Sequence, residues 1–191
     1  MRSSVSWLTL AAVLGVGALV GWWLPAPWLD WQPARAFSQP WRWWTAAFVH
    51  WSALHLVANL GALAVIAALG MVARLPSRIA WAWLAAWPLT HGALLLQPTL
   101  AHYGGLSGVL HAGVAVAAVG LVLRGQGTAR AIGAAIAAGL LAKVLLEAPW
   151  AGPLIQPHGW DIAVAPLAHA TGALAGWVCA WVALQFGGRR R

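Results

Sequence analysis

Residues 104–123 read GGLSGVLHAGVAVAAVGLVL: two glycines, a serine, and then an apolar run about as long as a bilayer is thick. The run predicts a membrane-spanning helix that begins near residue 106, because the glycines interrupt regular structure before it. A serine hydroxyl becomes a nucleophile when a base is aimed at it. The stretch therefore indicates a membrane fold and makes Ser107 a candidate nucleophile.

The composition of the whole chain is that of a polytopic helical membrane protein. Of its 191 residues, 62% are hydrophobic and 7% are charged. Hydropathy and the Pro/Gly breaks predict six spans, at about 6–24, 50–70, 79–96, 106–123, 130–148 and 164–185. Because the spans and their short loops use nearly all of the chain, we expect a single domain over residues 1–191.

The positive charges alternate along the chain. They lie at the N-terminus and then at every second connection or end of the predicted spans: Arg2, Arg74 and Arg78, Arg124 and Arg130, and Arg189, Arg190 and Arg191. The positive-inside rule then puts both termini in the cytoplasm, with the Pro- and Trp-rich segment 25–44 on the outer membrane surface. The net charge of +8 orients the protein in the bilayer, and it requires no nucleic-acid partner.

This topology starts the spans at residues 50, 106 and 164 on the outer side, so Ser107 and His169 lie near the same face. His169 falls about five residues into its span, or roughly 7–8 Å of helical rise below the interface. For Ser107 to meet it, the loop before the serine must dip inward. Gly104 and Gly105 permit this, since glycine accepts unusual backbone angles and close approach.

A further polar set opens the span at 50–70. His55 and Asn59 are four residues apart and share one helix face, whereas His50 points elsewhere and lies at the helix entrance. Together with the backbone N–H of Ser107, these two side chains form a candidate oxyanion hole. The alternative is that each polar residue only holds neighbouring helices together.

With these motifs assembled, the sequence resembles the rhomboid family of intramembrane serine proteases. The resemblance covers about residues 7–185 and is carried by Trp41-Arg42, His50-x4-His55-x3-Asn59, Gly105-Leu106-Ser107-Gly108 and Ala168-His169-x2-Gly172. It implies an all-α bundle of six transmembrane helices. It also implies that Ser107 is the nucleophile, His169 the general base and later acid, and that His55, Asn59 and the Ser107 amide bind the oxyanion.

The same resemblance implies a catalytic pair with no acidic third member. None of the three acids, Asp30, Glu147 and Asp161, is expected near His169 along a helix face. One position departs from the family pattern, because many rhomboids place a tyrosine where this chain has His111. A histidine there could stack on the catalytic ring or serve helix packing. Gly172 and Gly176, four residues apart, are expected to let the last helix approach the serine helix closely.

Within the family, the chain is most similar to rhombosortases, a short bacterial branch thought to process proteins with a Gly-Gly-type C-terminal sorting helix. The supporting features are the compact length, Ser107-Gly108-Val109-Leu110-His111, and the pair Lys143-x3-Glu147, which are spaced to form a salt bridge or to contact the substrate or a lid. The expected location is the bacterial inner membrane, with a transmembrane protein substrate and membrane lipid as partners.

Other readings stay open at this point. The chain could be a generic rhomboid protease with other substrates, or a catalytically silent rhomboid-like protein that binds helices. His55 or His169 could also ligate haem in a membrane protein. We expect no cofactor and no catalytic metal, because the sequence has no His-Glu-x-x-His and few carboxylates.

Overall fold

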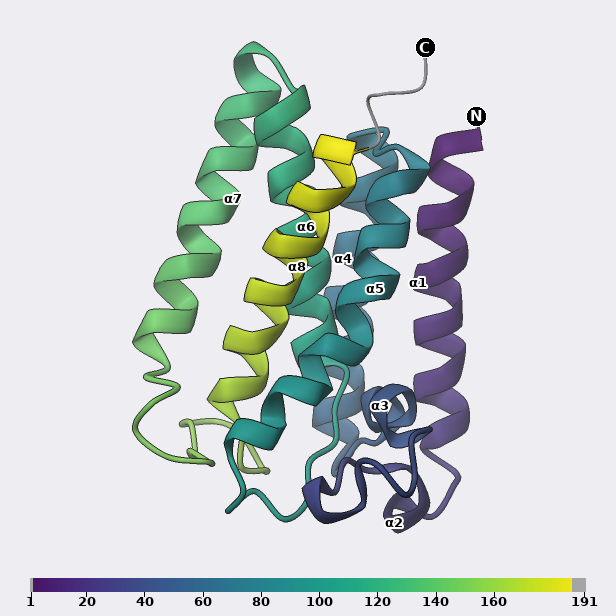
Figure 1. Cartoon of the computed structure of the whole chain (residues 1–191), viewed down its shortest axis with the longest axis vertical. Helices are drawn as coiled ribbons and strands as arrows, with labels where there is room; N and C mark the ends of the chain where they lie inside the picture. Colours follow the sequence, from purple (N-terminus) through teal and green to yellow (C-terminus); the bar gives the residue numbers. More distant parts are fainter. Residues whose placement is uncertain (1, 187–191) are drawn as a thin grey trace.

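The computed structural model describes residues 2–186, with residues 2–4 described by their backbone alone. Within this range the chain is a bundle of helices with no named strand (Figure 1). The long helices are α1 (Arg2–Gly21), α4 (Ala53–Val72), α5 (Ser77–Gly92), α6 (Ser107–Arg124), α7 (Gly127–Leu146) and α8 (Pro166–Phe186). Short turns connect them: α2 (Ala26–Leu29), η1 (Pro33–Arg35), α3 (Arg42–Thr45), η2 (Ala46–Phe48) and η3 (Ala93–Leu96).

The expected membrane character is confirmed. In the described range, five helical segments are long and apolar enough to cross a bilayer: α4, α5 extended by η3, α6, α7 and α8. The apolar part of α1, Val5–Gly21, is shorter, so six spans remain a prediction. The protein is thus an all-helical, multi-pass membrane protein.

The predicted helix bounds differ from the observed ones by a few residues, and α4 gives the clearest physical reason. The side chain of Ser52 accepts a hydrogen bond from the backbone N–H of His55 at 3.1 Å, and this cap fixes the first residue of α4 at Ala53. His50 therefore precedes the helix, whereas the sequence predicted a span that begins at this residue. Pro166 likewise begins α8 two residues later than expected.

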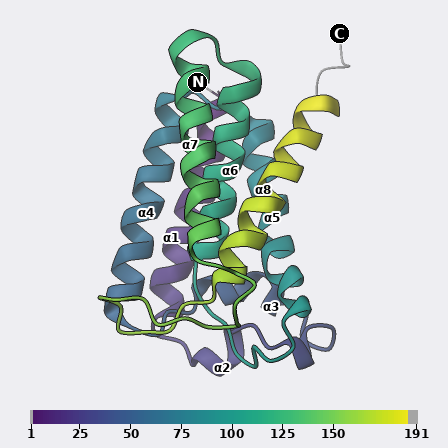
Figure 2. The ribbon, with the colours of Figure 1, turned by 90° about the vertical axis from the view of Figure 1, so that its left-hand side faces the viewer.

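Helix α6 lies at the centre of the bundle and packs against α4, α5, α7 and α8, while α1 packs on α4 and α5 (Figure 1). The start of α1 and the end of α8 lie at the same end of the bundle. The opposite end, here named the loop end, carries α2, α3 and the segments 93–106 and 147–165. Figure 2 shows α7 on the outside, with α4 and α8 on either side of it.

Small residues set the distance between α6 and α8, as expected from the sequence. A Cβ atom added at Gly172 would overlap the carbonyl oxygen of Gly108, and one added at Gly176 would lie 2.5 Å from the carbonyl oxygen of Ala112. Only glycine allows backbones to approach this closely. The contact brings the beginning of α8 against the beginning of α6 at the loop end. Gly61 in α4 has no such role, since a Cβ there would meet nothing within 4 Å.

A buried ion pair organises the loop end. Arg42 and Asp30 lie 2.8 Å apart, with side chains 2% and 1% exposed, and the second oxygen of Asp30 pairs with His102 at 2.6 Å. A backbone bridge between Trp31 and Tyr103 then links this segment to the loop that leads into α6. The segment 25–44, expected not to span, indeed contains only short helical turns.

The glycine at 172 gives a test of this packing. Gly172→Ala should lower the free energy of unfolding by about 1–3 kcal/mol, because the added methyl group forces α8 away from Gly108. Gly139→Ala is the matched control in α7, where a Cβ meets nothing within 4 Å and alanine favours the helix. Thermal unfolding in detergent measures both, and equal melting temperatures for the two variants would contradict the packing described here.

Candidate active site

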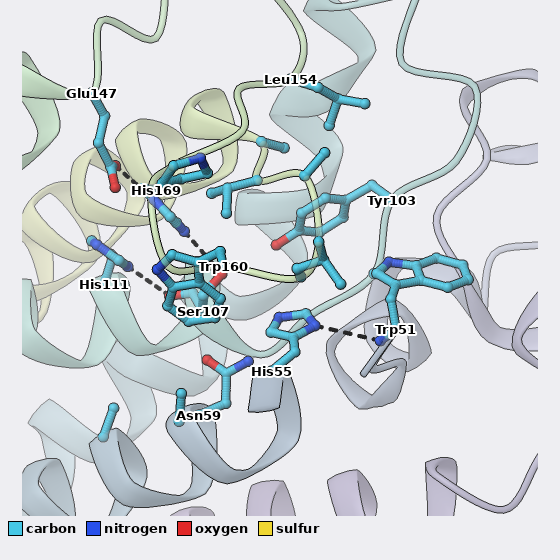
Figure 3. Close-up of a pocket in the computed structure, with 18 of the residues that line it drawn as sticks. Trp51, His55, Asn59, Tyr103, Ser107, His111, Glu147, Leu154, Trp160 and His169 are labelled. Atoms are coloured by element: carbon cyan, nitrogen blue, oxygen red, sulfur yellow. Dashed lines mark hydrogen bonds and ion pairs between the residues drawn. The ribbon is translucent and has the colours of Figure 1, made fainter. Parts of the chain in front are cut away.

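A cavity of about 330 Å³ opens at the loop end of the bundle (Figure 3). Side chains from α4, α6, α8, the end of α7 and the two flanking loops line it. Its polar members are His55, Asn59, His102, Tyr103, Ser107, His111, Lys143, Glu147 and His169. The cavity thus gathers the polar residues of distant segments at the ends of apolar helices.

Ser107 and His169 meet inside this cavity. The Ser107 hydroxyl donates a hydrogen bond to Nε2 of His169 across 2.9 Å, and His169 is 5% exposed. Ser107 is the first residue of α6 and His169 the fourth residue of α8, so the close contact between these helices brings the two side chains together.

Gly105 shapes the loop that delivers the serine. It adopts a φ of +143°, a value that disfavours other residues, and a Cβ there would stand 2.9 Å from the His55 ring. Its N–H donates to the carbonyl of Ala46 at 3.0 Å. The Tyr103 hydroxyl donates to the carbonyl of Gly105 at 3.2 Å. The conformation of the loop that leads into Ser107 therefore depends on a glycine that cannot be replaced without strain.

One expectation is wrong: an acid does lie beside His169. The Glu147 carboxylate accepts a hydrogen bond from Nδ1 of His169 at 2.7 Å (Figure 3). Glu147 follows the last residue of α7 and so reaches His169 from a different helix. Spacing along the helix of His169 does not reveal this neighbour, because Glu147 approaches from the end of α7. Glu147 also pairs with Lys143 at 2.6 Å, as their spacing predicted.

The surroundings of Glu147 keep it ionised. Burial pushes the pKa of Glu147 upward, but the hydrogen bond and charge of His169 and the Lys143 ammonium outweigh it and lower that pKa to about 2. A carboxylate can only accept, so the proton of the neutral His169 ring resides on Nδ1. The lone pair then lies on Nε2 and faces the hydroxyl of Ser107.

His111 occupies the place of the expected aromatic support. Its ring stacks on that of His169, with centroids 4.2 Å apart and planes 11° from parallel. Nδ1 of His111 donates to the carbonyl oxygen of Ser107 at 2.7 Å, which fixes the ring. A histidine at this position therefore packs on the face of His169 as an aromatic ring would.

His55 and Asn59 face the same cavity from α4. The backbone N–H of Trp51 donates to Nδ1 of His55 at 3.4 Å, so Nε2 carries the proton and is the free donor. The Asn59 side chain is 5% exposed, and its Nδ2 has no hydrogen-bond partner among the described residues. A buried amide without a partner costs free energy unless a ligand uses it.

His50 lies next to this set but does not line the cavity. Its ring centroid is 4.8 Å from that of His55, and its Nδ1 donates to the carbonyl of Phe48 at 3.3 Å. Burial lowers the pKa of His50 to about 4, against the opposing effect of that hydrogen bond, so the ring is neutral at neutral pH. Gly108, also expected to support the site, packs against the carbonyl of Ala168.

The loop 147–165 covers the cavity. Asp161 accepts a hydrogen bond from the Ser52 hydroxyl at 2.8 Å, and Trp160 stands edge-on to His55 with centroids 6.4 Å apart. Neither residue is among the site residues that the sequence predicts. The hydrogen bond between Asp161 and Ser52, the cap of α4, joins two segments more than 100 residues apart and appears only in the tertiary structure.

Three of these side chains could be considered as metal ligands. One donor atom each from His111, Glu147 and His169 lies within 4.8 Å of the others. The two imidazole rings are stacked nearly parallel, so their in-plane lone pairs run side by side and do not converge. Zinc needs donors that converge on one point in a tetrahedron. The donor set fits a hydrogen-bonded relay better than a metal centre.

The fold and the site together define a multi-pass helical membrane protein with a serine–histidine pair in a cavity near the ends of its helices. The Rhomboid domain family model matches residues 38–186, from the loop-end segment through α8. The chain belongs to the rhomboid family, which consists generally of intramembrane serine proteases acting on transmembrane substrates. No curated protein matches the chain.

The link between Asp161 and Ser52 predicts how the covering loop moves. Asp161→Ala should raise amide hydrogen exchange in residues 157–164 by about 2- to 10-fold, because one hydrogen bond worth about 0.5–1.5 kcal/mol is lost. Asp161→Asn, which keeps an acceptor oxygen, should raise it less. Mass spectrometry of the exchanged protein measures both, and unchanged exchange in Asp161→Ala would show that other contacts hold the loop.

Proposed function

We propose that this protein is an intramembrane serine endopeptidase that uses Ser107 and His169 to cleave a transmembrane-anchored substrate. The observation that carries the proposal is the 2.9 Å hydrogen bond from Ser107 to Nε2 of His169 inside a cavity that also holds an unpartnered amide donor. The arrangement supplies a nucleophile, a base with the correct tautomer and a site for negative charge.

The reaction follows from the positions of these groups. The Ser107 oxygen attacks the substrate carbonyl carbon while its proton passes to Nε2 of His169. The oxyanion that forms accepts hydrogen bonds from Nδ2 of Asn59, Nε2 of His55 and the Ser107 backbone N–H at the beginning of α6. His169 then returns the proton to the leaving amine, and water or another nucleophile releases the acyl group.

The substrate reaches Ser107 from the side of the bundle. A second cavity of about 330 Å³ lies among α4, α6 and α7. It shares Ala62 and the polar residues Asn59, Ser107, His111 and Lys143 with the first. Apart from these polar groups, its walls are alanine, glycine, leucine, isoleucine and valine side chains. An apolar helix is the ligand that such a groove in a membrane protein accommodates, so we propose that the substrate helix lies between α4 and α7.

We further propose that the cleavage site is a Gly-Gly-type signal at the start of a C-terminal helix. The likeness to rhombosortases supports this choice, and the cavity supports it sterically, because Trp51, Tyr103 and Trp160 line its walls. Glycines unwind from a helix at low cost and add no side chains to this aromatic space. The alternative is a generic rhomboid protease with other substrates, which would not require glycines at the cleavage site.

For the location, we propose a bacterial inner membrane with the loop end outside and both termini in the cytoplasm. Arg74, Arg78, Arg124 and Arg130 lie near the connections α4–α5 and α6–α7, at the end opposite the site (Figure 1). The positive-inside rule places that end in the cytoplasm. Three further arginines used for the topology, Arg189, Arg190 and Arg191, lie outside the described residues.

The catalytic roles predict the behaviour of two variants. Ser107→Ala and His169→Ala should each abolish cleavage of a transmembrane substrate in detergent and labelling of the protein by a fluorophosphonate probe, because nucleophile and base act as a unit. His158→Ala, an exposed histidine of the covering loop, is the matched control and should cleave normally.

Asn59→Ala refines the same test. Loss of one oxyanion donor should lower kcat by about 10²- to 10³-fold while the protein remains folded. Undiminished cleavage by Ser107→Ala or His169→Ala would refute the mechanism. Wild-type protein that binds a transmembrane helix but neither cleaves it nor reacts with the probe would instead identify a catalytically silent helix-binding protein.

The choice of substrate has its own test. A reporter with a Gly-Gly sequence directly before a C-terminal transmembrane helix should be cut at that sequence, and replacing both glycines by leucine should lower kcat/KM by at least about 10-fold because the helix no longer unwinds there. Mass spectrometry of the products locates the cut. Equal cleavage of both reporters, or a cut elsewhere, would identify a generic rhomboid protease.

A further inference from the structure

The carboxylate of Glu147 stands where charge develops during the proposed reaction. When His169 accepts the proton of Ser107, its ring becomes a cation, and it does so while only 5% exposed. A buried cation without a counter-charge is costly, so a neighbouring anion lowers the energy of this state. Glu147 is the acid that contacts the ring in the described chain.

The side chains of Ser107, His169 and Glu147 form a relay, meaning a continuous chain of hydrogen bonds. Ser107 donates to Nε2 at 2.9 Å on one side of the His169 ring, and Nδ1 donates to Oε2 of Glu147 at 2.7 Å on the other. The remaining oxygen of Glu147, Oε1, accepts from Nζ of Lys143 at 2.6 Å. Since both carboxylate oxygens have donors, the group is held in one orientation (Figure 3 shows its approach to His169).

The His169 ring is thereby held by three different neighbours. Ser107 contacts one nitrogen, Glu147 the other, and His111 covers a face. The stacked His111 fixes the plane of the ring but not its proton. The contact with Glu147 selects the tautomer, because a carboxylate at Nδ1 requires the hydrogen there and leaves the lone pair on Nε2.

A purely structural salt bridge explains less of this arrangement. Lys143 in the last turn of α7 and Glu147 directly after that helix are four residues apart, and they can neutralise each other without any third group. The carboxylate nevertheless reaches across to α8 and takes a second hydrogen bond from the ring that contacts Ser107. The charge of Lys143 also keeps the carboxylate ionised, which a counter-charge for His169 needs.

We propose that Glu147 is the positioning acid of the Ser107–His169 pair, so that this rhomboid operates with a three-residue relay in place of a two-residue one. The inference rests on the proposed function, because it needs Ser107 as the nucleophile. In the attack, the proton of Ser107 moves to Nε2 of His169, and the hydrogen on Nδ1 stays there. Glu147 remains a carboxylate throughout and stabilises the imidazolium by charge and orientation.

The test compares Glu147→Ala and Glu147→Gln with wild-type protein on one transmembrane substrate. The acid of a serine–histidine–acid triad contributes up to about 10⁴-fold to kcat, and because His111 also holds the ring we expect a loss of about 10- to 10³-fold for Glu147→Ala. KM should stay within about 2-fold, since Glu147 acts through His169. The rate of fluorophosphonate labelling should fall in parallel with kcat.

Glu147→Gln separates charge from shape. Glutamine keeps the volume and one acceptor oxygen but loses the charge, so its kcat should lie between those of the wild type and Glu147→Ala. Leu146→Ala is the matched control, because this neighbour at the same helix end is 86% exposed and should leave kcat and labelling unchanged. Melting temperatures of all variants separate a loss of rate from a loss of folded protein, and Glu147→Gln carries the comparison if Glu147→Ala does not fold.

The outcomes separate the two proposals. Wild-type kcat in folded Glu147→Ala and Glu147→Gln, with Ser107→Ala inactive, would overturn the relay and leave the proposed protease intact. A raised KM with unchanged kcat would also overturn it, because Glu147 would then bind substrate. If wild-type protein fails to cleave or Ser107→Ala still cleaves, the proposed function fails, and the relay fails with it.

Discussion

The close backbone contact between α6 and α8 is the constraint on which the rest of the site depends. Gly172, three residues after His169, lies against the carbonyl of Gly108, which directly follows Ser107. In a membrane, helices have little hydrophobic reason to associate, so van der Waals packing of small residues sets their distance. Here that packing brings a serine and a histidine, 62 residues apart in sequence, to 2.9 Å.

The acidic groups at the loop end are paired, whereas several buried nitrogen atoms there, those of Trp31, His50, Asn59 and His91, have no hydrogen-bond partner among the described residues. Asp30 is satisfied by Arg42 and His102, and Ser52 links Asp161 to the cap of α4. Such pairing is expected where few water molecules can compensate a buried charge. Of these nitrogens, only that of Asn59 belongs to a residue lining the described cavity with Ser107 and His169, where the carbonyl of the proposed substrate would supply an acceptor.

The chain has three acidic residues, and the structure uses each of them in a polar contact at the loop end. Asp30 fixes the segment before α4, Asp161 fixes the covering loop, and Glu147 contacts His169. Glu147 and the stacked His111 together hold the His169 ring, whereas the family resemblance implied a serine–histidine pair without an acid. The departure at His111 therefore does not leave His169 without support, since an imidazole and a carboxylate both restrain it.

The sequence by itself predicted the helical membrane fold, and it singled out Ser107, His169, His55, Asn59 and His111, which line one cavity in the structure. Hydropathy found the helices to within a few residues, and glycine spacing predicted the approach of α8 to α6, because these signals are local and periodic. The tertiary structure alone decided the position of Glu147 beside His169 and of Asp161 beside Ser52. Those contacts join different segments of the chain. How such segments are oriented and how far apart they lie depends on side-chain packing between helices, and residue spacing along a single helix does not contain this information.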